Sequence, residues 1–290
     1  MKCLLCESDR SHPVWGQNGS WIERCGGCGV LFTVNPPSQA ELINLYERGA
    51  LTGTPTELIG KNCGPPPAWK QREHLEILER IKRLGIRGGT LLDVGSFEGM
   101  FMRNAKQCGF GVMGVEPMRE AFIHAHDALG LPVVHGDLQS AAFPAASFTA
   151  VSLLDVIEHV SDPVAQLREV FRVLKCGGIL VITTPNAAGL LQRIVATKRK
   201  ICCQPWCPID DVPWHLWGFT PSTIRLCMEK AGFYVIAVNP LEPSTLSTNE
   251  NAGSTGWKRL ILHEAARFSK VVRMSDRMVG FAQKRIATPA

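Results

Sequence analysis

The sequence has no apolar run that reaches the roughly 20 residues a membrane-spanning helix requires. Its first residues, Met1 to Cys6, lack the apolar core of a secretory signal peptide, so we expect a cytosolic protein. It also has no internal repeat and no low-complexity tract. The excess of positive charge is only +5 over 290 residues, which permits an anionic partner without implying nucleic acid.

What is present fits a folded globular protein. Hydrophobic residues make up 45% and charged residues 20%, which argues against disorder. A chain of 290 residues is long enough for one α/β domain and a small appendage. There are eleven cysteines, and because nothing indicates secretion, free thiols or metal ligands are better expectations than disulfides.

From Lys70 onward, short apolar segments alternate with helix-length stretches, which predicts a doubly wound parallel sheet. One helix has Leu75, Leu78, Ile81 and Leu84 on its inner face and closes at Gly85. Two more have clear first and last residues: one runs from Asp162-Pro163 to Gly177-Gly178, with Val164, Leu167, Phe171 and Leu174 inside, and one runs from Thr220-Pro221 to Gly232. Strands are expected near 90–94, 111–115, 132–135, 148–154, 178–183 and 233–239.

The stretch from Leu91 to Phe101 carries the strongest functional signal. A strand ends in Asp93, a turn from Gly95 to Gly99 follows, and a helical pattern comes next. This order brings backbone N–H groups and a helix N-terminus to one edge of the sheet. The next strand ends in Glu116, where a carboxylate can accept both hydroxyls of a ribose. Together they predict a nucleoside pocket.

The chain resembles class I S-adenosylmethionine-dependent methyltransferases from about Leu75 to Val238. The resemblance rests on the glycine turn, on residues 154–163 (LDVIEHVSDP) and on residues 215–221 (HLWGFTP). It implies a Rossmann-like, mostly parallel seven-stranded sheet, closed by an antiparallel strand near 278–284. The expected organisation is a zinc ribbon at 1–35, a connector at 36–69, and a methyltransferase domain at 70–290 with insertions at 187–217 and 241–276.

The resemblance also implies roles for individual residues. Acids after the second and third strands hold the ribose and the adenine, matching Glu116 and Asp137. The positions expected to bind S-adenosylmethionine are Asp93, Gly95, Ser96, Phe97, Glu98, Gly99, Glu116, Pro117, Asp137, Leu138, Leu154 and Asp155. Phe97 departs from the family, since it stands where a glycine is usual. A dinucleotide site is the alternative for this loop, but its glycines do not fit G-x-G-x-x-G.

Four cysteines form two knuckles, Cys3-x2-Cys6 and Cys25-x2-Cys28. Two such pairs can place four thiolates in a tetrahedron around zinc, which leaves no open position for a reacting water. The zinc is therefore expected to be structural, as in methyltransferases with an N-terminal zinc ribbon that this chain resembles. Cys202, Cys203 and Cys207 lack a fourth ligand at knuckle spacing and are interpreted as packing thiols.

The acceptor is the least determined part of the prediction. His159 and His215 are candidate bases for a hydroxyl acceptor, with structural roles as the alternative. Asp155 is expected to contact cofactor or substrate. We predict a small-molecule acceptor, with an oxygen of a sugar, glycan precursor or secondary metabolite as the methylated atom.

The alternatives are an RNA methyltransferase that uses the ribbon for recognition, and a non-catalytic interaction protein on the same scaffold. An Asn/Asp-Pro-Pro-aromatic pattern after the fourth strand, typical of base-amine methylation, is absent, so nucleic acid is not favoured. Residues 257–273 have the pattern of an amphipathic basic helix, interpreted as packed on the domain, with membrane-surface contact as the alternative.

Overall fold

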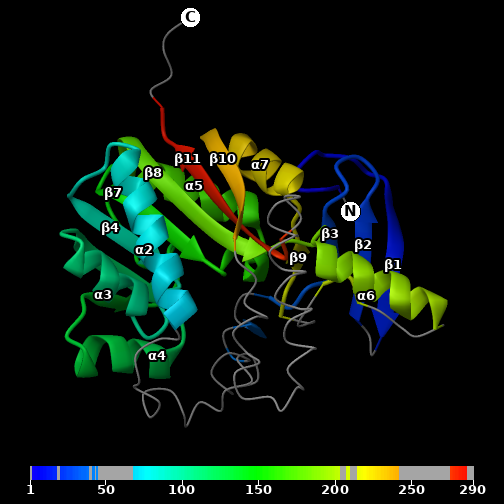
Figure 1. The fold of residues 1–290 in the computed structure, drawn as a ribbon, viewed down its shortest axis with the longest axis horizontal. Helices are drawn as coiled ribbons and strands as arrows, with labels where there is room; N and C mark the ends of the chain where they lie inside the picture. The colour runs from blue at the N-terminus through cyan, green and yellow to red at the C-terminus, as the bar shows by residue number, and fades with distance from the viewer. Residues whose placement is uncertain are drawn as a thin grey trace, which may run out of the picture.

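The computed structural model describes residues 2–17, 20–38, 41, 42, 44, 68–202, 207–209, 214–241 and 275–285. A seven-stranded sheet forms its centre, with strand order β10-β11-β8-β7-β4-β5-β6 (Figure 1). Strands β4 to β8 run parallel, and β11 is antiparallel to both of its neighbours. The predicted fold class and the closing antiparallel strand are confirmed. The strands are β4 (Thr90–Val94), β5 (Gly111–Glu116), β6 (Val133–His135), β7 (Phe148–Leu154), β8 (Leu174–Pro185), β10 (Tyr234–Leu241) and β11 (Arg277–Gln283).

Helices cover both faces of this sheet because successive strand residues point to opposite sides. Leu91 of β4 packs with α2 (Ala68–Arg83) and α3 (Met100–Gln107), whereas Leu92 packs in the core beneath α5 (Pro163–Val173) and α7 (Pro221–Lys230). Helix α4 (Arg119–Ile123) continues into the π-helical turn η2 (His124–Ala128), between β5 and β6. Parallel strands with helices on both faces place the strand ends of β4, β5 and β7 at one open edge.

The helix starts on the α5/α7 face are built as the sequence predicts. The Asp162 side chain accepts a hydrogen bond from the Ala165 N–H at 2.9 Å, and Pro163 occupies the first turn. Thr220 forms a capping box with Thr223 at the start of α7. These caps fix where each helix begins, and so where the preceding loops cross the sheet edge.

Two details of the predicted helices are wrong. Helix α5 ends at Val173 rather than at Gly177-Gly178, because Leu174 already pairs with Phe148 of β7 and starts β8. Leu75 is exposed on α2, whose buried face carries Glu73, His74, Ile77, Leu78 and Ile81. The helix is rotated so that two polar side chains reach partners inside the molecule, described below.

The N-terminal segment forms a second, four-stranded sheet, β1 (Ser11–Gln17), β2 (Ser20–Cys25), β3 (Leu31–Val34) and β9 (Trp217–Gly218) (Figure 1). We call residues 2–34 the ribbon. Its strand β3 pairs with β9, which begins at the last residue of the predicted insertion at 187–217. Several of the ribbon's buried side chains join the α5/α7 core. The ribbon is thus attached to the large sheet by both backbone and side-chain contacts.

Within the described part of the chain, no helix combines the length and apolar character needed to cross a membrane. The insertion contains helix α6 (Leu190–Ile201). The expected helix at 257–273, Cys203 and most of the connector and the 241–276 insertion lie outside the described residues.

Candidate functional site

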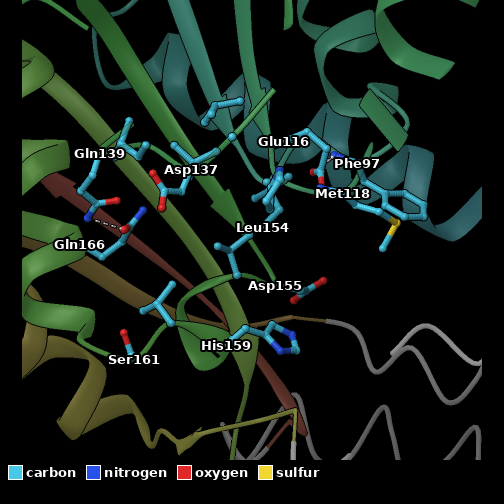
Figure 2. A pocket seen from close by; sticks show the side chains of 18 of the residues that line it. Phe97, Glu116, Met118, Asp137, Gln139, Leu154, Asp155, His159, Ser161 and Gln166 are labelled. Carbon is cyan, nitrogen blue, oxygen red and sulfur yellow. Dashed lines mark hydrogen bonds between the residues drawn. The ribbon is translucent and has the colours of Figure 1, made fainter. Parts of the chain in front are cut away.

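A cavity of about 620 Å³ opens at the carboxyl ends of β4, β5 and β7 (Figure 2). This volume is within the range of small-molecule sites, and the position is where open α/β sheets bind ligands. Eight of the predicted cofactor-binding residues line it. They are Gly95, Phe97, Glu116, Pro117, Asp137, Leu138, Leu154 and Asp155.

The other four predicted residues do not line the cavity. Asp93 is buried and accepts a hydrogen bond from Ser152 Oγ at 2.7 Å. Burial raises the pKa of Asp93 to about 7. Ser96, Glu98 and Gly99 belong to the same turn but are absent from the cavity wall. The expected contact of these four residues with a cofactor stays a prediction.

The β4–α3 turn has an unusual backbone. Gly95, Phe97 and Gly99 all have positive φ angles of +69°, +48° and +77°. A Cβ at Gly95 would lie 2.7 Å from Val156 Cγ2, so the loop needs glycine there. Phe97 adopts the same left-handed region without being glycine, and its N–H donates to Glu116 Oε2 at 2.7 Å. The carboxylate thereby ties the turn to the end of β5.

Glu116 lies at one end of the cavity with Phe97 and Met118 beside it, as Figure 2 shows. It also accepts the Met118 N–H at 2.8 Å. Burial raises the pKa of Glu116 to about 7, although the two N–H donors favour the charged form. Because a carboxylate has about four lone-pair directions, two remain for the hydroxyls of a ligand.

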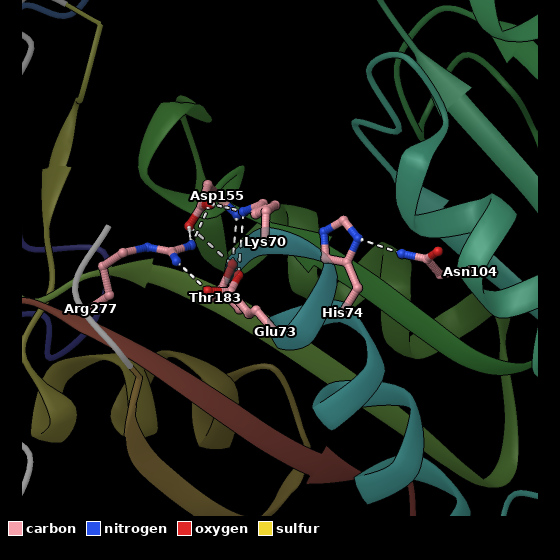
Figure 3. A network of polar contacts seen from close by, with 7 residues as sticks. All are labelled: Lys70, Glu73, His74, Asn104, Asp155, Thr183 and Arg277. Carbon is pink, nitrogen blue, oxygen red and sulfur yellow. Dashed lines mark hydrogen bonds and ion pairs between the residues drawn. The ribbon is translucent and has the colours of Figure 1, made fainter. Parts of the chain in front are cut away.

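Asp155, His159 and Ser161 also line the cavity and lie below Glu116 in the view of Figure 2. Asp155 has a φ of +57° and belongs to a partly buried ion network that no sequence pattern predicted (Figure 3). Arg277 Nη2 contacts Asp155 Oδ2 at 2.6 Å, and Lys70 Nζ contacts the same oxygen at 3.1 Å. Burial alone would raise the pKa of Asp155, but these two cations hold it well below its ordinary value.

The network continues onto α2. Arg277 also pairs with Glu73, and Lys70 pairs with Glu73 at 3.3 Å. Next to them His74 hydrogen-bonds Asn104 at 3.1 Å, and burial lowers the pKa of His74 to about 3, so it is neutral (Figure 3). No sequence signal links Arg277 to Glu73, since 204 positions separate them. The network borders the cavity through Lys70 of α2 and through Asp155, which directly follows β7.

The two predicted histidines lie together, with ring centroids 4.6 Å apart. His159 lines the cavity, whereas His215 does not. Burial and the neighbouring His215 lower the pKa of His159 to about 4, so the ring is neutral at pH 7. A low pKa means that the neutral imidazole is a weak base, so His159 is a poor general base near neutrality.

The four cysteine thiols of the ribbon converge. Cys3 and Cys28 Sγ atoms are 3.7 Å apart, Cys6 and Cys25 are 3.4 Å apart, and all four lie within 4.8 Å of one another. Sulfur atoms around a tetrahedral zinc ion lie about 3.8 Å apart for Zn–S bonds of about 2.3 Å. Burial of Cys25 opposes ionisation, but N–H donors from Cys28 and Gly27 outweigh it and lower its pKa to about 6. The donor set and spacing therefore fit a structural metal.

Comparison with known proteins agrees with this architecture. The profile of the methyltransferase domain family matches residues 68–238. A ubiquinone biosynthesis O-methyltransferase from Dinoroseobacter shibae is 28% identical over 154 residues, covering 50% of this chain and 60% of that protein. The chain spans about half to three fifths of the length of the curated relatives it matches.

Solved structures share the fold at low sequence identity. A SAM-dependent methyltransferase from Archaeoglobus fulgidus superposes with a TM-score of 0.53 at 18% identity, covering 74% of this chain and 94% of that one. The [4+2]-cyclase SpnF superposes with a TM-score of 0.58 at 16% identity, covering 88% and 99%. A cyclase among the neighbours shows that the fold alone does not fix the reaction. The family match over residues 68–238 places this chain in the methyltransferase domain family, with the Rossmann-like sheet of S-adenosylmethionine-dependent methyltransferases.

Proposed function

We propose that the protein transfers a methyl group from S-adenosylmethionine to an oxygen of a small molecule. The observation that carries the proposal is Glu116, a buried carboxylate at the end of β5 that borders a cavity of about 620 Å³. Its remaining lone pairs suit a ribose diol, and Asp137 borders the same cavity one strand further on. When bound, S-adenosylmethionine supplies an electrophilic methyl group on sulfur.

We assign the residues that border the cavity to two roles, cofactor binding and acceptor binding. Glu116 and the Gly95 turn hold the nucleoside and amino-acid parts, whereas Asp155 and His159 border the space left for an acceptor. Most of the rate enhancement would come from positioning the acceptor in line with the leaving sulfur. Relatives named as O-methyltransferases of ubiquinone biosynthesis support an oxygen acceptor; a sugar or glycan precursor stays a prediction.

We also propose that Cys3, Cys6, Cys25 and Cys28 bind one structural zinc ion. The support is the sulfur geometry given above, together with two backbone N–H groups that donate to Cys25 Sγ at 3.3 and 3.5 Å. Such donors stabilise thiolates, which is the form that binds zinc.

Titration with S-adenosylhomocysteine by calorimetry tests the cofactor site. We expect micromolar binding by wild type and at least about a hundredfold loss in Glu116→Ala, since both ribose hydroxyls lose a charged acceptor. The matched control is Glu79→Ala, an acid on the exposed face of α2. Wild type that is folded but binds no S-adenosylhomocysteine would overturn the proposal. If wild type binds S-adenosylhomocysteine as expected, product analysis after incubation with S-adenosylmethionine and hydroxyl or amine acceptors identifies the methylated atom.

Cofactor binding should depend on pH through Glu116. Its pKa in the free protein is about 7, and hydroxyl donors favour the ionised form, so affinity should rise as pH increases through 7. We expect the dissociation constant for S-adenosylhomocysteine to be about tenfold larger at pH 6 than at pH 8. Glu116→Gln should bind weakly with a flat profile over this range. An equally steep profile in that variant would assign the titration to another group.

A further inference from the structure

A second group of metal-ligating side chains lies beside the cavity, apart from the cysteines of the ribbon. It comprises Glu158 and His159 of the 3₁₀ turn η3 (Ile157–His159) and His215 from the loop before β9. One ligand atom from each lies within 4.8 Å of the others. The three residues come from segments that the fold brings together at the carboxyl end of β7.

Glu158 gives the first indication that this group has a ligand. Its side chain is buried, with 1% of the residue exposed. Thr184 Oγ1 donates to Glu158 Oε2 at 3.0 Å, but Oε1 has no hydrogen-bond partner among the residues that the structure describes. A buried carboxylate oxygen without a partner is costly, and a cation would satisfy it. The Thr184 contact meanwhile fixes the direction in which Oε1 points.

His159 gives a second, independent indication. Its Nδ1 lies 3.0 Å from the carbonyl oxygen of Trp214. A carbonyl can only accept, so Nδ1 carries the proton and Nε2 carries the lone pair. An imidazole whose far nitrogen donates to a carbonyl is the usual arrangement of a metal-binding histidine.

The ribbon holds the third member in place. Thr33 of β3 donates through its N–H to the Leu216 carbonyl at 2.8 Å and through its hydroxyl to the His215 carbonyl at 3.4 Å. The Leu216 N–H in turn donates to the Glu158 carbonyl at 2.8 Å. The backbone of the His215 loop is therefore fixed on one side by the ribbon and on the other by η3.

We propose that Glu158, His159 and His215 form a binding site for a divalent transition-metal cation. Two imidazoles and one carboxylate suit such ions and leave open coordination positions. Ligand atoms about 2.1 Å from a common ion lie about 3.0 to 3.4 Å apart, so small side-chain rotations close the present spacing. An ion held by His159 lies at the wall of the cavity, because His159 borders it.

The role of this ion rests on the proposed methyl transfer. A hydroxyl of the acceptor bound to the cation becomes more acidic and releases its proton to solvent. The oxygen lone pair then forms the new carbon–oxygen bond while the methyl–sulfur bond breaks, and that electron pair stays on sulfur as a neutral thioether.

Binding of Mn²⁺ to zinc-loaded protein, followed by electron paramagnetic resonance, tests the site without requiring turnover. Mn²⁺ prefers oxygen and nitrogen ligands and so does not report on the four thiols. Wild type should take up one Mn²⁺ per chain, and Glu158→Gln should weaken uptake by about a hundredfold. Thr184→Val, which removes only the hydrogen bond to Glu158, should weaken it about tenfold. The exposed His12→Ala on β1 is the matched control and should behave as wild type.

Each variant is also titrated with S-adenosylhomocysteine, which shows whether the cavity is folded. Glu158 does not line the cavity, so this binding should be retained in Glu158→Gln. No Mn²⁺ uptake by wild type, or equal uptake by wild type and Glu158→Gln, would refute the metal site while leaving the proposed function intact. Mn²⁺ uptake as expected with no S-adenosylhomocysteine binding would instead refute the proposed function and keep the metal site.

Discussion

Replacing Cys25 with serine is expected to remove zinc from the ribbon and to unfold it. Cys25 is buried and accepts two backbone N–H donors, so its thiolate is the best-supported of the four. A segment of this size buries little apolar surface by itself, and structural zinc contributes on the order of 10 kcal/mol to such a fold. Metal analysis should give about one zinc per wild-type chain and none in Cys25→Ser.

The thermal midpoint of Cys25→Ser should also fall markedly, because ribbon side chains such as Val30 and Phe32 belong to the α5/α7 core. The matched control is Cys176→Ser, which changes an exposed thiol outside the cluster. It should keep both the zinc and the wild-type midpoint. A Cys25→Ser protein that retains one zinc and unfolds at the wild-type temperature would show that the four thiols do not form a metal site.

The Cys25→Ser substitution should also affect the proposed metal site at Glu158, His159 and His215. Loss of the ribbon removes Thr33, which fixes the backbone at His215 and Leu216. If that loop is positioned by the ribbon, Cys25→Ser should lose the proposed Mn²⁺ binding along with zinc. Glu116 and the Gly95 turn lie on other elements, so S-adenosylhomocysteine binding should suffer less wherever the variant stays folded.

Features that depend on a few neighbouring residues could be predicted from the sequence. The Gly95 turn, the Asp162 and Thr220 caps and the acid ending β5 each depend on a few neighbouring residues, and all are found at the expected places. The family resemblance added the seven-stranded sheet and its closing antiparallel strand, which no local pattern contains. It also pointed to His159 and His215, although only one of them borders the cavity.

Side-chain contacts between residues far apart in the sequence could not be predicted. Leu75 fits the apolar stripe of α2, but the helix buries Glu73 and His74 instead. Glu73 forms an ion pair with Arg277, and His74 forms a hydrogen bond with Asn104. A charged residue on a helix is normally read as solvated, so nothing in the sequence marks Glu73 as buried. Likewise, nothing in the sequence marks Thr184 as a partner of Glu158, and only the fold brings the two side chains into hydrogen-bond contact.

Replacing Arg277 with methionine is expected to destabilise the protein by about 3–5 kcal/mol, since it leaves the buried Glu73 without its main counter-charge. The Arg277 side chain is 8% exposed and that of Glu73 is 6% exposed, so solvent cannot replace the lost contact. Lys70 alone would then serve both Glu73 and Asp155. Urea unfolding of wild type and Arg277→Met measures the difference.

The double variant Arg277→Met with Glu73→Gln separates the loss of an ion pair from the loss of packing. If the cost arises from the uncompensated charge of Glu73, the double variant should be more stable than Arg277→Met alone. Arg83→Met is the matched control, because Arg83 forms an exposed pair with Glu79 on the same helix and should change stability by less than about 0.5 kcal/mol. A double variant less stable than Arg277→Met would show that Glu73 stabilises α2 without Arg277. The network would then be held chiefly by Lys70, which reaches both acids from within that helix.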